Sequence, residues 1–414
     1  MTRKFADQIK PLEVAIVGCG RVARKHLRAL TDNRRYLIPA ALIDPNRMAA
    51  EELRDILPKK RVRELPYFAS LGKYLASRVE RQAGATREKA DRFIVAINTP
   101  SSSHYELATE ALAAGADLLI EKPITLVPSE GYKLIEMAAE RRRLIATGHI
   151  YRYFPLVNEI REALGQGVWG RPLAAELSVC WGHSQAYYDQ AAWRGTWSND
   201  GGALMNQTVH ALDLLCYLLD SPLVSVGGQI DRVAHDIEAE DIGMAIGHTA
   251  AGTMVKILGT TATSPQRKTA EFTLHCENGT VIAGICGKRP YFKIHSETSA
   301  GKRCRILAAQ WRARRENGLG LMIRGWINPH TAIYTDLAKA IIRDMRKADG
   351  SYAGAASLAD KSVEVRADAL GAVQAVENIL AIYASAKANG CVVSIPVQGF
   401  TMEEMCDYSF AEWR

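Results

Sequence analysis

Residues 13–27 read EVAIVGCGRVARKHL, and this stretch decides the fold of the first part of the chain. A β-branched run ends at Gly18 and a segment with helical spacing follows, so a buried strand turns tightly into a helix. Gly18 permits the turn, Gly20 lets the backbone approach a pyrophosphate, and Ala23 lets helix and strand pack closely. Because the GxGxxA pattern stands in the strand–turn–helix context that it requires, it predicts a dinucleotide site rather than a plain tight turn.

The second predicted strand, residues 39–45, bears on the choice of cofactor. Asp44 follows the glycine loop at about the 20-residue distance typical of dinucleotide-binding folds. A carboxylate at this position hydrogen-bonds the ribose hydroxyls and repels a 2′-phosphate, so Asp44 favours NAD over NADP. Arg47 lies close by and keeps NADP as the alternative.

The pattern of elements divides the chain. Strands and helices alternate over the first part, which predicts the α/β class and a Rossmann domain with a doubly wound parallel sheet. Later, short strands recur at hairpin spacing, with turns such as ENGT at 277–280, before a long apolar helical pattern at 367–390. The expected parts are a Rossmann domain at 1–149, an α+β substrate-binding and oligomerisation domain with a large open antiparallel sheet at 150–400, and a tail at 401–414.

The totals are those of an ordinary soluble protein, with 414 residues, 48% hydrophobic and 23% charged. The net charge of +7 is modest and spread widely, which favours a small anionic ligand slightly and is weak support for nucleic acid as a partner. No apolar run approaches the ~20 residues of a membrane span, and the N-terminus does not resemble a signal peptide. Eight cysteines without a CxxC pair are typical of reduced thiols, so we expect a cytoplasmic protein.

Residues 200–215, DGGALMNQTVHALDLL, place an amide and an imidazole in an otherwise apolar helical pattern. Asn206 and His210 are four residues apart and therefore share one face of the predicted helix. Histidine suits the removal of a hydroxyl proton because its pKa lies near working pH. Asp213 is expected either to hold the second ring nitrogen of His210 or to face solvent. The structural alternative for His210 is a hydrogen-bonded histidine of the core.

Lys122, in IEKPIT at 120–125, stands at the end of a predicted sheet strand and before a proline. Ligands of open α/β sheets bind at the carboxyl ends of the strands. An ammonium group at this position can hydrogen-bond a reacting oxygen and stabilise negative charge on it. A solvated surface lysine is the alternative.

Four motifs in this order resemble the Gfo/Idh/MocA family, named for glucose–fructose oxidoreductase and inositol dehydrogenase. The motifs are GxGxxA at 18–23, NTPSSSH at 98–104, EKP at 121–123 and GG…NQTVH at 201–210. The resemblance implies a Rossmann domain and an open antiparallel sheet. It also implies hydride transfer between a nicotinamide cofactor, NAD or NADP, and a secondary alcohol carbon of a sugar, cyclitol or nucleotide-linked sugar, in a dimer or tetramer.

The resemblance further implies roles for single residues. Lys122 matches the family lysine that contacts the reacting hydroxyl, so Lys122, His210 and Asn206 are the expected catalytic residues. Asn206 stands where many members have aspartate; because an amide only orients a partner or binds substrate, His210 should act as base alone. Ala203 replaces a glycine of the pattern. The residues expected at the cofactor are Gly18, Gly20, Arg21, Val22, Asp44, Thr99, Pro100, His104, Glu121 and Lys122.

A loop rich in aromatic and polar residues, YYDQAAWRGTWSNDGG at 187–202, precedes the helix and suits a sugar ring. Packing of the loop on itself is the alternative, and interdomain structure is the alternative for residues 151–152. The basic segment at 302–315 is expected either to be solvated or to bind a phosphate or carboxylate of the substrate. The expected substrate contacts are Tyr151, Arg152, Tyr188, Trp193, Arg194, Asn206 and, from the resemblance, His330.

Two other functions remain open on this fold: a glycosidase that uses NAD transiently, and a sensor that binds dinucleotide without turnover. The presence of both Lys122 and His210 argues against the sensor. No metal ion is expected in the site. Apolar residues at both alternating positions of 242–249 and 257–263 imply that both faces of the second sheet are covered. A second subunit, or the basic segment at 302–324, is the expected cover.

Overall fold

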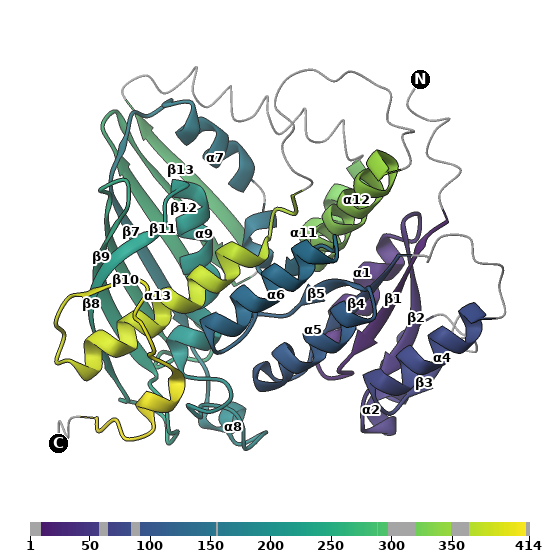
Figure 1. Cartoon of the computed structure of the whole chain (residues 1–414). Coiled ribbons are helices and arrows are strands. Elements are labelled where there is room, and N and C mark those ends of the chain that lie inside the picture. The colour runs from purple at the N-terminus through teal and green to yellow at the C-terminus, as the bar shows by residue number, and fades with distance from the viewer. Residues whose placement is uncertain are drawn as a thin grey trace. The chain divides into compact units, whose positions relative to one another are not determined.

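Figure 1 shows the computed structural model of the chain, which describes residues 10–57, 65–83, 92–154, 156–287, 289–296, 319–348 and 364–410. The chain forms two compact units. Unit 1 comprises residues 1–124, 130–150 and 319–369, and unit 2 comprises 125–129, 151–318 and 370–414. The division differs from the expected one because residues 319–369 belong to unit 1 and not to the second domain.

Unit 1 contains the predicted doubly wound parallel sheet, with strand order β3-β2-β1-β4-β5-β6. The order reverses between β1 and β4, and in open α/β sheets a ligand binds outside the carboxyl ends of the strands at such a point. The strands are β1 (Leu12–Val17), β2 (Leu37–Ile43), β3 (Tyr67–Phe68), β4 (Phe93–Ile97), β5 (Asp117–Ile120) and β6 (Ile145–Thr147). The helices between them are α1 (Ala23–Asp32), α2 (Arg47–Arg54), α4 (Leu71–Ala83), α5 (His104–Ala113) and α6 (Pro128–Glu140).

Two later helices, α11 (Leu319–Ile327) and α12 (His330–Ala348), complete unit 1. The start of α12 is hydrogen-bonded to the end of α1: Asn33 donates to the carbonyl of Thr331 over 2.9 Å, and Thr335 donates to Asn33 Oδ1 over 2.6 Å. These bonds join residues about 300 positions apart, which no local pattern predicts. α12 therefore covers part of the buried face of α1.

Unit 2 is built on an eight-stranded sheet with strand order β13-β12-β11-β7-β10-β9-β8-β14. All pairs are antiparallel except β7 with β10, so the sheet is mixed rather than purely antiparallel as expected. The strands are β7 (Pro172–Trp181), β8 (Leu223–Asp231), β9 (Ile242–Thr249), β10 (Met254–Thr260), β11 (Lys268–Cys276), β12 (Gly279–Cys286), β13 (Arg289–Ser296) and β14 (Val393–Ser394).

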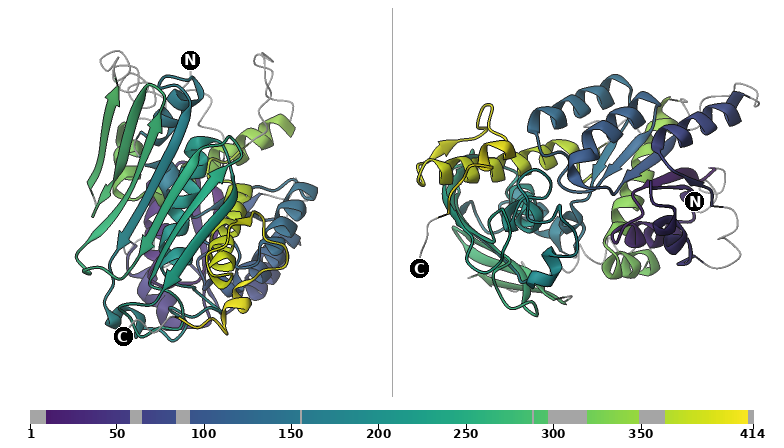
Figure 2. Two further views of the ribbon diagram at one scale, coloured as in Figure 1. Left: turned by 90° about the vertical axis from the view of Figure 1, so that its left-hand side faces the viewer. Right: turned by 90° about the horizontal axis from the view of Figure 1, so that it is seen from below.

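Helices cover one face of this sheet, and Figure 2, left, looks onto the other face. The covering helices are α7 (Val157–Gly165), α9 (Val209–Leu219) and α13 (Ala369–Lys387). Ser385 of α13 accepts a hydrogen bond from the N–H of Gly228 in β8 over 2.9 Å. α13 is long and apolar enough to span a membrane, but 78% of that stretch is buried, as in the core helix of a folded domain.

The predicted tail at 401–414 packs on unit 2 over its described part. A short 3-10 helix at Met402–Met405 buries both of its methionines, which are 3% and 0% exposed. Lys387 at the end of α13 also binds Asp407 over 2.7 Å. Residues 401–410 are therefore part of the folded unit and not a loose extension.

Candidate active site

The glycine loop after β1 has the geometry that a pyrophosphate requires. Gly18 has a φ of +84°, and an added Cβ would lie 2.8 Å from the carbonyl of Asn98, so only glycine fits. A Cβ on Gly20 would meet nothing within 4 Å, so this side of the loop is open. Within the described part of the chain, the N–H groups of Gly20 and Arg21 make no hydrogen bond. The loop and the start of α1, with Val22 as its N-cap, therefore fit the phosphates of NAD.

Asp44 follows β2 and lies beside this loop. Its carboxylate accepts hydrogen bonds of 2.8 Å from the N–H groups of Cys19 and Asn46. The side chain is thus held at the carboxyl end of β2, where a cofactor ribose is expected. Arg47, the residue that left NADP as the alternative cofactor, is exposed and pairs with Glu51 over 2.8 Å.

His104 joins the segments that follow β4 and β5. Its ring nitrogens lie 2.8 Å from the carbonyl oxygen of Pro123 and 3.0 Å from that of Thr99. The side chain is 1% exposed, and burial lowers the pKa of the imidazole. His104 therefore positions the Thr99–Pro100 and Lys122–Pro123 segments from the interior of unit 1 and does not offer an open face to a ligand.

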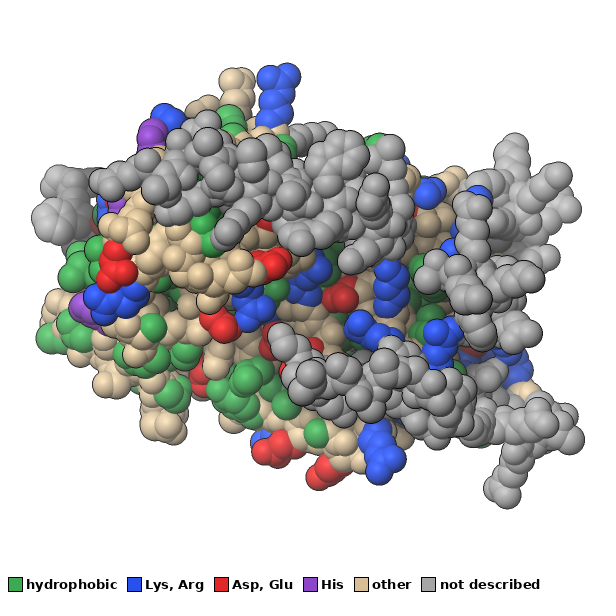
Figure 3. Space-filling model, turned by 90° about the horizontal axis from the view of Figure 1, so that it is seen from above, with side chains coloured by type: hydrophobic (Ala, Val, Ile, Leu, Met, Phe, Trp, Pro, Cys, Tyr) green, Lys and Arg blue, Asp and Glu red, His purple; other side chains and the backbone are tan. Residues whose placement is uncertain are grey.

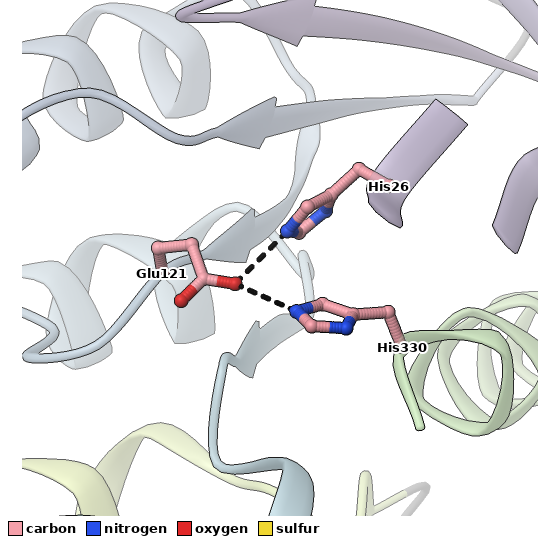
Figure 4. Close-up of side chains that lie close together, drawn as sticks. All are labelled: His26, Glu121 and His330. Carbon is pink, nitrogen blue, oxygen red and sulfur yellow. Dashed lines mark hydrogen bonds and ion pairs between the residues drawn. The ribbon is translucent and has the colours of Figure 1, made fainter. Parts of the chain in front are cut away.

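Glu121 turns into unit 1, where it meets two histidines (Figure 4). Its Oε1 lies 2.9 Å from His26 Nε2 and 3.1 Å from His330 Nε2, and its Oε2 accepts the N–H of Lys122 over 3.2 Å. Burial raises the pKa of the carboxyl, but the two histidines outweigh it and hold that pKa well below its usual range. His330 was expected near the substrate, yet it is 3% exposed and packs against Glu121.

In unit 2 the predicted helix around His210 begins with a π-helical turn. Residues Leu204–Thr208 are π-helical and α9 follows, so the prediction of one uniform α-helix is wrong for Asn206. The hydroxyl of Thr208 donates to the carbonyl of Ala203 over 3.1 Å, and a side chain inserted in this way opens the α-helical ladder. π-helical turns occur frequently at functional sites.

Asn206 is fixed by two neighbouring side chains. Its amide nitrogen donates to the carboxylate of Asp200, and its amide oxygen accepts from Gln207. Asp200 is 8% exposed and was not among the predicted site residues. Asp200 lies in the SNDGG loop at 198–202, directly before the glycines of the motif. This position just before the helix was the sign in the sequence that could have identified Asp200 as a site residue. A carboxylate thus touches Asn206 although position 206 itself carries an amide.

His210 is half-buried, and Tyr151 packs against it with ring centroids 5.2 Å apart. Burial raises the pKa of the Tyr151 phenol, so this ring is neutral. Arg152, expected to contact substrate, is instead 3% exposed and binds Asp213 with two hydrogen bonds of 2.8 and 2.6 Å. Asp213 therefore faces Arg152 in the interior of unit 2 and does not face solvent.

The aromatic loop that precedes the helix packs largely on itself. Tyr188 is buried and its hydroxyl lies 2.8 Å from that of Thr261. Arg194 donates to the carbonyl of Tyr187 over 2.5 Å and lies over the Tyr187 and Trp193 rings. Trp193, 37% exposed, presents an aromatic surface to solvent. The basic residues at 302–315 lie outside the described residues.

Two further features of unit 2 lie near the helix that carries His210: a buried carboxyl group and an apolar pocket. Glu240 is fully buried, accepts the N–H of Leu204 over 2.8 Å and the hydroxyl of Tyr383 over 2.9 Å, and burial raises its pKa to about 8. Nothing in the acidic run EAED at 238–241 distinguishes Glu240 and Asp241, which are both 0% exposed, from the other acidic residue. A largely apolar pocket of about 160 Å³ lies between α7, α9 and the sheet. Its lining includes Tyr151, Phe154, Leu214, Phe272, Tyr291 and Phe292.

Comparison with known families matches both units. A profile described as an oxidoreductase family with an NAD-binding Rossmann fold matches residues 12–149, and a GFO/IDH/MocA C-terminal domain profile matches residues 157–282. Together the two profiles cover more than half of the chain.

Individual relatives point in the same direction. A UDP-N-acetylglucosamine 3-dehydrogenase from Acidithiobacillus ferrooxidans is 30% identical over 152 residues, which is 37% of this chain and 41% of the relative. A D-glucoside 3-dehydrogenase from Escherichia coli is 27% identical over 225 residues, 53% of this chain and 58% of the relative. The matches thus span about half the length of these curated relatives. The WlbA dehydrogenase from Bordetella pertussis, solved with NADH and UDP-GlcNAcA, is 25% identical with a TM-score of 0.75, covering 94% of this chain and 99% of that one.

Proposed function

The chain belongs to the Gfo/Idh/MocA family of NAD-binding oxidoreductases, and from this premise we propose that it oxidises the 3-hydroxyl of a pyranose sugar carried on a nucleotide. Both curated relatives named above are 3-dehydrogenases, one of UDP-N-acetylglucosamine and one of a D-glucoside. The WlbA structure, which covers nearly the whole chain, holds a UDP-linked sugar. These relatives support the position of the reacting hydroxyl and the phosphate-bearing substrate class.

The observation that carries the proposal is the environment of His210. The half-buried imidazole of His210, the second residue after a π-helical turn, packs against the neutral Tyr151 ring with centroids 5.2 Å apart. A purely structural core helix has no need of this arrangement. The same chain carries a glycine loop that is open above Gly20 and so fits a dinucleotide.

The mechanism divides between a proton and a hydride. His210 takes the proton of the sugar hydroxyl. The hydrogen on the carbon that bears this hydroxyl leaves as hydride, with the electron pair of its C–H bond, and the carbon becomes a ketone. NAD, when bound, supplies the acceptor for that hydride. Lys122 stabilises the negative charge that develops on the sugar oxygen. Asn206, held by Asp200, hydrogen-bonds the sugar and takes no part in proton transfer.

Substrate recognition in this proposal rests mainly on exposed groups. Trp193 offers an aromatic face of the kind that packs on a sugar ring. Tyr188 and Arg194 hold the Trp193 loop in shape through the contacts described above. The basic segment at 302–315 remains a candidate for binding the phosphates.

The open face of the unit 2 sheet supports a homo-oligomer. Met244, Ile246 and Met254 point to this face and are 55%, 58% and 50% exposed. An antiparallel sheet with one solvated face normally alternates with polar residues there, so these side chains are unusual. A second copy, docked sheet to sheet as a dimer or within a tetramer, would cover them. Light scattering checks this, and a monomer of 45.5 kDa overturns it.

Two features of the chain support a small-molecule enzyme of the cytoplasm. The described cysteines are all free thiols, which is typical of reducing compartments. On the face shown in Figure 3, described Lys and Arg side chains lie near Asp and Glu side chains over much of the surface, a mixed distribution that suits a small-molecule enzyme.

The decisive experiment follows the hydrogen atom. UDP-linked hexoses and simple glucosides labelled with deuterium at C3 are incubated with NAD, and the reduced cofactor is analysed by mass spectrometry. We expect deuterium to appear in NADH. Unlabelled NADH from a C3-deuterated substrate that is turned over contradicts the assigned hydroxyl. Release of the leaving group without net NADH would instead indicate the glycosidase.

A further inference from the structure

Three side chains from distant parts of the sequence meet inside unit 1. His26 comes from α1, Glu121 follows β5, and His330 begins α12 (Figure 4). Glu121 Oε1 lies 2.9 Å from His26 Nε2 and 3.1 Å from His330 Nε2, and the three nearest nitrogen and oxygen atoms lie within 4.8 Å of one another. The side chains of His26, Glu121 and His330 are only 0%, 11% and 4% exposed.

Outer contacts hold both imidazoles with Nε2 toward the carboxylate. The hydroxyl of Tyr334 lies 3.0 Å from His26 Nδ1, and Asn328 Oδ1 lies 3.2 Å from His330 Nδ1. In known metal sites, the second nitrogen of a ligating histidine is almost always engaged in this way by an oxygen. The inner and outer contacts together therefore have the form of a metal site and its supporting shell.

The hydrogen-bond donors and acceptors around His330 show that its contact with Glu121 requires a positive charge. Asn328 Nδ2 donates to the carbonyl of Lys25 over 2.8 Å, which fixes the amide so that Oδ1 faces His330. Oδ1 only accepts hydrogen bonds, so His330 Nδ1 must carry the ring proton. Nε2 of a neutral His330 then presents a lone pair to Glu121 Oε1 at 3.1 Å. Two acceptors at this distance require a positive charge between them.

Either a proton on Nε2 or a metal ion can supply this charge. The side chains of His330 and Glu121 are 4% and 11% exposed, so the charge is held out of bulk water. A metal ion accounts for both contacts of Glu121 Oε1 at once, because His26 Nε2 lies 2.9 Å from the same oxygen.

We propose that His26, Glu121 and His330 bind a divalent transition-metal ion, with Zn²⁺ as the best fit. Imidazole nitrogen with one carboxylate oxygen suits Zn²⁺ rather than the hard cations Mg²⁺ and Ca²⁺. Tetrahedral ligands at ~2.1 Å from zinc lie roughly 3.4 Å apart. The separations of 2.9 and 3.1 Å between Glu121 Oε1 and the two Nε2 atoms are a few tenths of an ångström shorter than this, and the three ligand atoms all lie within 4.8 Å of one another. The ion would join α1, which carries the cofactor loop, to α12 and to the residue before Lys122.

The test measures metal directly and does not depend on turnover. Untagged protein is purified without chelator, its zinc content is measured by mass spectrometry, and the stripped protein is titrated with Co²⁺ by visible absorption. We expect about one equivalent of metal per chain and the absorption of four-coordinate cobalt. Chelation should lower the Tm of the wild type, because metal binding stabilises the folded state.

Variants locate the site. Glu121→Gln and His330→Gln should each weaken Co²⁺ binding by at least about tenfold and make the Tm insensitive to chelator. His275→Gln is the matched control, because His275 and Glu176 form an exposed pair at 3.2 Å that could attract metal adventitiously. Circular dichroism checks that each variant is folded. Metal binding that survives in folded Glu121→Gln but is lost in His275→Gln overturns the assignment.

The wild-type titration decides the proposal even where a variant fails to fold. A wild-type chain that holds well under one-tenth of an equivalent of metal, and shows no cobalt absorption on titration, overturns it. That result would place a proton between His330 and Glu121 as a buried ion pair.

Discussion

Replacing Asp213 by asparagine tests how α9, the helix that carries His210, is held. Arg152 and Asp213 share two hydrogen bonds of 2.8 and 2.6 Å, and their side chains are 4% and 0% exposed. Asp213→Asn keeps the volume but removes the charge opposite a buried guanidinium. Breaking a buried pair from one side costs about 3–5 kcal/mol, because the remaining charge stays in the interior. We expect the free energy of unfolding of unit 2 to fall by that amount.

Asp220→Asn provides the matched control. Asp220 pairs with Arg161 over 2.6 Å, but the two side chains are 79% and 38% exposed. Exposed pairs contribute ~0–1 kcal/mol, and asparagine tolerates the left-handed backbone at this position, where φ is 49°. Both arginines also lie over the same ring, Tyr217, at 4.6 and 4.2 Å. The two substitutions therefore differ chiefly in burial.

Urea unfolding followed by tryptophan emission measures the difference, because Trp169, Trp181 and Trp197 all lie in unit 2. The same variant should also lose activity. Arg152 follows Tyr151, whose ring packs on His210, and Asp213 is one helical turn beyond His210. A lower kcat with unchanged Kd for NAD is expected. Equal unfolding free energies for the two variants, within about 1 kcal/mol, would refute the reasoning.

Three further predictions concern the cofactor, the chemistry and pH. Asp44→Ala should reduce the preference for NAD over NADP in paired binding titrations; tighter binding of NADP to the wild type would show that another residue governs the choice. Lys122→Ala and His210→Ala should each lower kcat by ~10²–10⁴-fold while NAD still binds, and near-normal turnover would remove that residue from the mechanism. Burial raises the pKa of Glu240 from 4.5 to about 8, so its contribution to stability is full below pH 4.5 and is lost as pH rises through 8. Glu240→Gln should flatten this part of the stability profile in thermal unfolding, and Glu176→Gln, an exposed control, should not.

The sequence predicts best the features that depend on neighbouring residues. The glycine loop is recognisable because the tight turn, the open approach and the close packing fall within six residues at 18–23. The family resemblance identified Lys122 and His210 as candidate catalytic residues, and it too rests on short motifs of neighbouring residues. Strand alternation likewise indicated most of the second sheet, including the apolar side chains that β9 exposes.

Contacts between distant residues were beyond the reach of these patterns. Arg152 was expected to bind substrate, because nothing near it in the sequence identifies Asp213 as a buried partner. His330 and Glu121 were assigned to different ligands, although their side chains meet at 3.1 Å. Asp200 and Glu240 were missed because an acidic residue in a polar loop normally faces water. Only the fold shows which acidic side chains turn inward.

Residues 319–369 belong to unit 1 but follow residues 151–318 of unit 2 in the sequence, and this order has a consequence for synthesis of the chain on the ribosome. A ribosome releases the chain from its N-terminus, so the sheet of unit 1 emerges long before α12. Until then α1 lacks the cover that bonds such as Asn33 to Thr331, 298 positions apart, provide. Such remote pairing slows folding. The nascent Rossmann half therefore exposes this flank of α1 while residues 151–318 of unit 2 are translated.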